Sequence, residues 1–173
     1  MPATPDLRQE QGDVAALSFS IAVPLVPDQA SGTVSCVLGF DYGARRIGVA
    51  VGQRMLGTAT AIAVVPNTPQ GPQWDRIDAL VRDWRPDALV VGHPLTLAGE
   101  EQPASHGARK FGAALAQRYG LVVIEQDERY SSREAGARFA HARNAGQRRQ
   151  KDAALLDAMA AQVIVESYFA RGS

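Results

Sequence analysis

The sequence predicts an α/β fold in which a five-stranded mixed sheet carries helices on both faces. Two observations predict it. Three strand-like runs joined by short, Gly-containing turns come first, at 34–41, 46–53 and 58–65. Helix-like and strand-like segments then alternate to the end of the chain. Strands that are reached through helices pair in parallel and need helices on both faces of the sheet, so the two observations together indicate a mixed sheet.

The first half of the domain is a predicted antiparallel meander followed by a helix. The three runs are rich in Val, Ile, Thr and Ala, and turns containing Gly43 and Gly57 separate them. Segment 72–84 has apolar residues at helical spacing, and Pro86 ends the pattern. Trp74 and Trp84 belong to this pattern. We assign both to packing and not to a base-stacking platform, because few basic residues interleave with them.

The second half alternates strands and helices. Segment 87–91 is a short buried strand, and 103–119 is a helix with Pro at its start and Gly120 just after its end. Segment 121–124 is the next strand. Ser131 and Glu134 have the spacing of a capping box and open a short helix. An Ala-rich helix over 151–170 comes last. The order β-β-β-α-β-α-β-α is that of the ribonuclease H-like fold.

The domain organisation follows from where these patterns begin. Residues 1–33 contain four prolines and no sustained period, which indicates a loosely ordered N-terminal extension. An edge strand over 19–26 is the alternative, and Pro24 makes it less favourable. Residues 34–173 then form the ribonuclease H-like domain.

Composition excludes several classes of protein. The chain has 173 residues, with 18 Lys+Arg against 18 Asp+Glu, and 46% of its residues are hydrophobic. Cys36 is its single cysteine, which excludes an intramolecular disulfide and a thiolate zinc site. The apolar stretch 15–26 is too short to span a bilayer and lacks the positively charged start of a secretory signal. We therefore expect a soluble, cytoplasmic protein with no membrane association.

Three acidic residues are candidates for a catalytic site. Asp41 ends the first strand, although an acid before Gly commonly only caps a turn. Asp127 and Glu128 follow the last strand, where side chains alternate, so one of them faces the pocket; we favour Glu128. Asp157 lies among small apolar residues of the last helix, and a carboxylate on such a face must neutralise, pair or bind a metal.

The topology predicts that Asp41, Glu128 and Asp157 converge at one edge of the sheet. Three oxygen ligands without a thiolate suit Mg²⁺ or Mn²⁺ better than Zn²⁺. Two such ions about 4 Å apart would activate a water molecule and stabilise the leaving oxygen during phosphodiester hydrolysis. These three residues are therefore the predicted catalytic residues and metal ligands.

A basic segment points to nucleic acid. Residues 129–151 contain seven basic residues and one acid, Glu134. Such a segment is predicted to hold a phosphate backbone with salt-sensitive affinity, although a solvated face is an equally frequent interpretation of a charge run. Arg109, Lys110 and Arg118 are candidates to extend it. The residues assigned to nucleic-acid binding are Arg45, Arg46, Arg129, Arg133, Arg143, Arg148, Arg149 and Lys151.

Four motifs resemble the YqgF family of ribonuclease H-like proteins, which are related to Holliday junction resolvases. The resemblance runs from residue 34 to residue 170. The motifs are Gly39-Phe40-Asp41-Tyr42-Gly43 with 46–50, Val90-Val91-Gly92-His93-Pro94-Leu95 with Gly99, Asp127-Glu128-Arg129-Tyr130-Ser131, and Asp157 with Ala160-Ala161. The chain departs from the family at His93, where an apolar residue is more usual, at Tyr130, and in its long N-terminal extension. We interpret His93 as a loop residue.

The resemblance implies a cytoplasmic bacterial nuclease that processes the 5′ end of pre-16S ribosomal RNA, with an acidic triad on Asp41, Glu128 and Asp157. One alternative is a Holliday junction resolvase that acts on branched DNA. Another is a non-catalytic nucleic-acid-binding module whose acids are structural. An actin-like ATPase is disfavoured because it needs two copies of the fold. The choice between RNA and DNA, and between monomer and homodimer, stays open at this stage.

Overall fold

The computed structural model describes residues 34–96, 98–128 and 150–172. The predicted extension 1–33 lies outside these residues, as does the short helix expected from Ser131.

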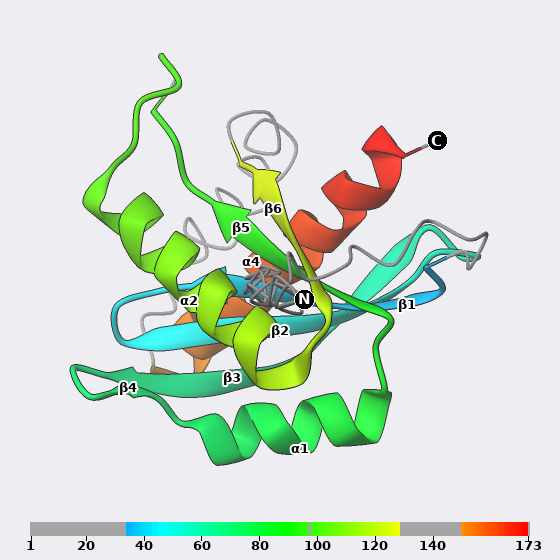
Figure 1. Cartoon of the computed structure of the whole chain (residues 1–173), viewed down its shortest axis with the longest axis horizontal. Coiled ribbons are helices and arrows are strands. Elements are labelled where there is room, and N and C mark those ends of the chain that lie inside the picture. Colours follow the sequence, from blue (N-terminus) through cyan, green and yellow to red (C-terminus); the bar gives the residue numbers. More distant parts are fainter. Residues whose placement is uncertain (1–33, 97, 129–149, 173) are drawn as a thin grey trace, which may run out of the picture. The chain divides into compact units, whose positions relative to one another are not determined.

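A six-stranded mixed sheet forms the centre of the domain (Figure 1). Its strands are β1 (Cys36–Tyr42), β2 (Arg46–Gln53), β3 (Thr58–Thr68), β4 (Gly71–Pro72), β5 (Ala88–His93) and β6 (Val122–Asp127). Their order is β4-β3-β2-β1-β5-β6. The meander β1-β2-β3 is antiparallel, and β5 and β6 run parallel to β1. The predicted α/β class is confirmed.

The predicted strand number of five was one too low. The additional strand, β4, has two residues and pairs with Asn67 and Thr68 at the end of β3. A two-residue strand is too short to produce a periodic pattern, so the sequence could not reveal it. It also explains why α1 (Trp74–Trp84) begins two residues later than predicted.

Helices cover both faces of the sheet, as predicted. α1 and α2 (Pro103–Tyr119) lie on one face, and α4 (Gln150–Arg171) lies on the other (Figure 1). α2 has the predicted bounds because both ends carry local signals. Gln102 and Ser105 form a capping box at its start, and Gly120 adopts a left-handed conformation with φ 63° after its end.

Alternating side chains along the strands divide the core into two layers. On the α1/α2 side, Leu38 and Phe40 of β1 are fully buried against residues such as Phe111 of α2. On the α4 side, Val37 of β1 packs against Val165. Asp41, which follows Phe40 in β1, therefore faces α4.

α4 is apolar over most of its surface. Its span 153–171 is long and apolar enough to cross a membrane, but a core helix of a soluble domain has the same properties. Here the helix lies along β1, β2 and β3 and buries Ala161, Ile164 and Val165 against them. Packing against the sheet accounts for the apolar residues of α4 that are buried, whereas Leu155 is 58% exposed.

Three glycines let α4 approach the sheet closely. A Cβ atom at Gly39 or Gly52 would collide with the Val165 side chain. A Cβ atom at Gly48 would collide with the backbone carbonyl of Asp157. Because glycine has no Cβ atom, α4 lies nearer to β1 and β2 at these three positions than any other residue would permit.

Candidate active site

Asp41 lies near the end of the central strand β1, between two glycines. Gly48 of β2 is its antiparallel partner. On the other side, β1 and β5 pair in parallel up to Phe40 and Val91, and the next step of this register places Gly92 beside Asp41. The strand positions on either side of Asp41 therefore place no side chain beside its carboxylate on the α4 side.

The other two predicted acids enter this space. The backbone of Asp157 lies directly over Gly48, and the carboxylate of Glu128 lies directly over Gly92, where a Cβ atom would collide with it. Glu128 follows the last residue of β6, and its backbone N–H donates to the carbonyl of His93 at 3.3 Å. The structure thus brings Asp41, Glu128 and Asp157 together at the ends of β1, β5 and β6.

Neighbouring carboxylates raise the pKa of two of the three acids, Asp41 and Glu128. Burial and then the charge of Asp157 raise the pKa of Asp41 to about 6. Burial and then the charges of Asp41 and Asp127 raise the pKa of Glu128 to about 7. Both shifts have the same cause: a partly desolvated carboxylate is less stable when ionised beside other anions. A cation at this position would relieve the repulsion.

Arg46 supplies one positive charge to the cluster. Its Nε lies 2.8 Å from Oδ2 of Asp157. The contact is an ion pair without hydrogen-bond geometry. Both atoms are buried, and neither has a hydrogen-bond partner within the described part of the chain. Arg46 was predicted to bind nucleic acid, and in this state it pairs with a predicted catalytic residue. The pattern of charges in the sequence did not reveal this pairing.

The chemistry of the three acids fits a divalent cation. Their side chains are not already arranged as a set of metal ligands. Within the described ranges, no group of three His, Cys, Asp or Glu side chains has the arrangement of a metal site. The donors are nevertheless three carboxylates, which are the ligands that Mg²⁺ and Mn²⁺ prefer. The buried, unsatisfied Oδ2 of Asp157 is one ligand position that a cation would share or take from Arg46.

We expect the metal-free protein to lose stability as the pH rises from about 4 to about 7. The pKa values of Asp41 and Glu128 are raised from 3.8 and 4.5 to about 6 and about 7, so the folded state binds more protons than the unfolded state in this window. The expected loss is on the order of 1–3 kcal/mol. Urea denaturation in the presence of a chelator, at both ends of the window, measures it.

Asp41→Asn is the control for this pH dependence, because the amide does not titrate. It should flatten the decline between about pH 4 and 6. A wild-type unfolding free energy that increases over the whole window would contradict the electrostatic description of the cluster.

The basic residues predicted to bind nucleic acid are only partly within the described ranges. Arg45 is exposed in the β1–β2 turn beside Arg46. Arg129, Arg133, Arg143, Arg148 and Arg149 lie outside the described residues, and the side chain of Lys151 is not described. Their assignment stays a prediction.

Two of the three candidates to extend the basic patch are engaged by acids. Arg118 donates two hydrogen bonds to Asp78, at 2.7 and 2.6 Å, and Arg109 pairs with Glu101. Lys110 is exposed, and no described acid forms an ion pair with it. Of the three, Lys110 is therefore the one that remains available to bind an anion.

His93 is the last residue of β5 and is only 6% exposed. The prediction that His93 lies in a loop was therefore wrong, because β5 extends two residues beyond the predicted strand. Since Gly92 faces Glu128 and Ile164, the side chain of His93 faces the α2 side, away from the acids. Neither of its ring nitrogens has a hydrogen-bond partner among the residues that the structure describes.

Residues 35–171 match the family model RuvX, described as Holliday junction resolvase. The chain belongs to the RuvX family. The resemblance to YqgF proteins, read from four motifs, is thereby confirmed. The family match begins two residues after the predicted N-terminal extension and covers all three acids.

Several curated relatives of this RuvX chain come from Xanthomonas. A protein of Xanthomonas oryzae pv. oryzae (strain PXO99A) is 53% identical over 134 residues, which are 78% of this chain and 86% of that protein. One from Xanthomonas campestris pv. campestris (strain B100) is 52% identical over 132 residues, 76% and 85% of the two chains. Both carry the name "Putative pre-16S rRNA nuclease". The RuvX chain is accordingly a nuclease, a hydrolase that acts on phosphodiester bonds.

A solved structure supports the fold. Thermus thermophilus RuvC in complex with a Holliday junction substrate superposes with a TM-score of 0.50 and 18% sequence identity, over 80% of this RuvX chain and 96% of RuvC. At this level of identity the likeness concerns the fold alone. It confirms the predicted ribonuclease H-like architecture.

Proposed function

We propose that this RuvX protein is a divalent-metal-dependent nuclease that processes the 5′ end of pre-16S ribosomal RNA in the cytoplasm. The observation that carries the proposal is the convergence of Asp41, Glu128 and Asp157 over two glycines, which leaves repelling carboxylates where a cation would bind. The RNA substrate is supported by the names of relatives that are 53% and 52% identical.

Asp41, Glu128 and Asp157 would hold the cation. When bound, Mg²⁺ or Mn²⁺ would activate a water molecule and stabilise charge on the leaving oxygen. Asp41 is suited to hold the cation rigidly, because its strand β1 is hydrogen-bonded to β2 on one side and to β5 on the other. Glu128 is held by its backbone hydrogen bond to His93.

Arg46 has two roles in this proposal. In the metal-free protein its guanidinium compensates the charge of Asp157. If Asp157 held a cation, the guanidinium would no longer be needed to compensate its charge, and the Arg46 side chain is already 40% exposed. A planar guanidinium there would bind a phosphate oxygen of the substrate. Arg45 in the adjoining turn would bind a neighbouring phosphate.

Cleavage assays on two substrates test the proposal. The purified full chain is incubated with Mg²⁺ or Mn²⁺ and either a pre-16S rRNA fragment that retains its 5′ leader or a four-way DNA junction. We expect cleavage of the RNA on the 5′ side of the mature end, abolished by a chelator and restored by excess cation.

The second substrate separates the alternatives. Cleavage of the DNA junction with no action on the RNA would favour the resolvase that the family description names. Binding of both substrates without cleavage would favour the non-catalytic module. Cleavage that persists in a chelator would contradict the metal-dependent proposal for either substrate.

A further inference from the structure

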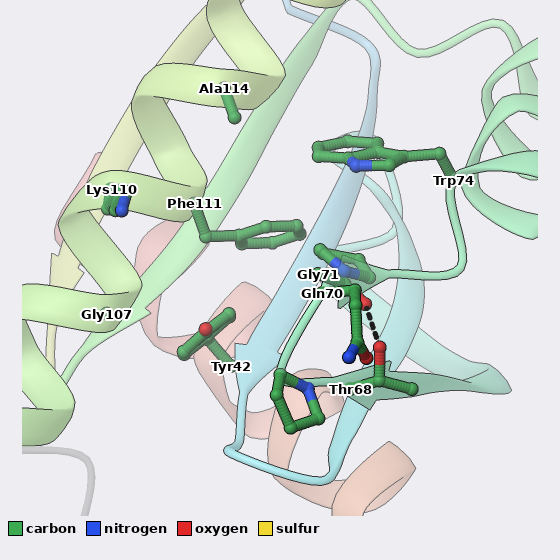
Figure 2. Close-up of a pocket in the computed structure, with 11 residues that line it drawn as sticks. Tyr42, Thr68, Gln70, Gly71, Trp74, Gly107, Lys110, Phe111 and Ala114 are labelled. Carbon is green, nitrogen blue, oxygen red and sulfur yellow. Dashed lines mark hydrogen bonds between the residues drawn. The ribbon is translucent and has the colours of Figure 1, made fainter.

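A pocket of about 280 Å³ lies on the face of the sheet opposite the acids, between α2 and the β3–β4 hairpin (Figure 2). Tyr42 of β1, Trp74 of α1 and Phe111 of α2 form its aromatic wall. Lys110 of α2 and Thr68 and Gln70 of the hairpin form its polar rim. We call this the aromatic pocket. The cleavage reaction proposed above does not use it.

The three rings pack together, and the guanidinium of Arg118 lies over the Trp74 ring, 5.1 Å from its centroid. Phe111 forms the base of the wall, 4% exposed, with its ring centroid 5.2 Å from that of Tyr42 and 6.0 Å from that of Trp74. The Trp74 and Phe111 rings are 29° from parallel. Tyr42 and Trp74 are only half-buried. Part of each of these two rings is therefore accessible to a ligand.

The charge and the hydrogen-bonding groups at the rim of the aromatic pocket suit a nucleotide. None of the residues that line it is acidic. Lys110 supplies a positive charge on the α2 side, and the exposed amide of Gln70 can both donate and accept hydrogen bonds. Thr68 donates to the carbonyl of Gly71 at 3.1 Å, which holds the hairpin that carries Gln70 (Figure 2). Aromatic faces beside a cation are the usual features of sites for unpaired bases.

The aromatic pocket adjoins the acids across the sheet. Tyr42 follows Asp41 in β1, and consecutive side chains point to opposite faces. The turn after Tyr42 passes from one face to the other and carries exposed Arg45. Asn67 holds this turn through hydrogen bonds to the carbonyls of Gly43 at 2.7 Å and Arg45 at 2.8 Å. A nucleic-acid strand that crosses this edge of the sheet would contact both the acids and the aromatic pocket.

We propose that the aromatic pocket binds one unpaired nucleobase of the nucleic-acid substrate, next to the phosphate that lies at the acids. This inference rests on the proposed nuclease function and specifies its substrate as locally single-stranded. Trp74, predicted from the sequence to serve packing alone, would then also contact the substrate. The sequence could not place Tyr42, Trp74 and Phe111 together, because they come from three different elements.

Tryptophan fluorescence tests the proposal without any cleavage. The chain has two tryptophans, and Trp84 lies at the far end of α1 from Trp74. Trp84→Phe therefore leaves Trp74 as the sole tryptophan. This variant is titrated, in a chelator, with a short oligouridylate and with an abasic ribose-phosphate oligomer of the same length. We expect saturable quenching by the oligouridylate and affinity for the abasic oligomer about fivefold weaker or more.

Filling the pocket provides the matched comparison. Ala114 lines it, whereas Ala113 is exposed on the same helix and does not. Ala114→Leu should weaken oligouridylate binding about fivefold and leave binding of the abasic oligomer unchanged. Ala113→Leu should change neither. Equal loss for both oligomers with Ala114→Leu, or no quenching of Trp74, would overturn the proposal.

A surface variant keeps the test valid if Ala114→Leu does not fold. Lys110→Gln changes an exposed side chain of the pocket rim, and Arg76→Gln changes an exposed side chain of α1 outside it. Lys110→Gln should weaken oligouridylate binding severalfold more than Arg76→Gln does. Equal effects would overturn the proposal. Since binding is measured without cation, a failure of cleavage and a failure of base binding give separate results.

Discussion

Asp41→Asn should reduce cleavage by about 10³-fold while leaving the fold intact. Asp41 is the acid of the central strand, between Gly48 and Gly92, and the other two acids lie over those glycines. Asparagine retains the shape of the side chain and removes the charge that a divalent cation requires. Single-turnover cleavage at saturating cation, with the same substrate for both proteins, measures the loss.

The same substitution should stabilise the metal-free protein at neutral pH. Burial and the charge of Asp157 raise the pKa of Asp41 to about 6, so its ionised form is destabilising in the folded state above that pH. Removing the charge should also lower the pKa of Glu128, since Asp41 is one cause of its elevation. A variant that is inactive because it is unfolded would show a lower, not a higher, unfolding free energy, and would not support the assignment.

Gly48→Ala should destabilise the protein by about 3 kcal/mol or more and remove most activity. The added Cβ atom would collide with the backbone carbonyl of Asp157, which cannot move without moving α4. Displacing α4 separates Asp157 from Asp41 and also disturbs the core at Val165. Urea denaturation and a cleavage assay on the same preparation test both parts.

Gly112→Ala is the matched control. A Cβ atom there would lie 3.5 Å from Val123 and 3.9 Å from Val91, which is ordinary contact distance. Since alanine favours a helix over glycine by about 1 kcal/mol, the unfolding free energy should be unchanged or somewhat higher. If Gly48→Ala were equally harmless, the close packing of α4 would not be what brings Asp157 to the site.

Local signals explain which elements could be predicted. α2 has its predicted bounds because Pro103 and Gly120 mark its two ends, and β2 agrees because it is a long run between turns. β4 was missed because two residues carry no period. β5 was predicted to end at Val91, but its parallel pairing with β6 continues through His93. Where a strand end depends on pairing with another strand, it cannot be predicted from the strand's own sequence.

The candidate site was partly predictable for a similar reason. Asp41, Glu128 and Asp157 were identified from their positions at element ends and from the apolar surroundings of Asp157. The contribution of Gly48 and Gly92 was not identified, because it depends on which residues lie across the sheet and under α4. The pairing of Arg46 with Asp157 likewise joins β2 to a helix more than a hundred residues later in the chain.

The sequence by itself determined the α/β class, the order of helices and strands, and which acids are available for catalysis, because periodicity, capping residues and turn residues act over a few neighbouring positions. The tertiary structure decided how these parts meet. Only packing shows that glycines on β2 and β5 make room for the other two acids beside Asp41. Only packing brings the aromatic rings of β1, α1 and α2 together behind the same strand end, because contacts between distant segments depend on three-dimensional proximity.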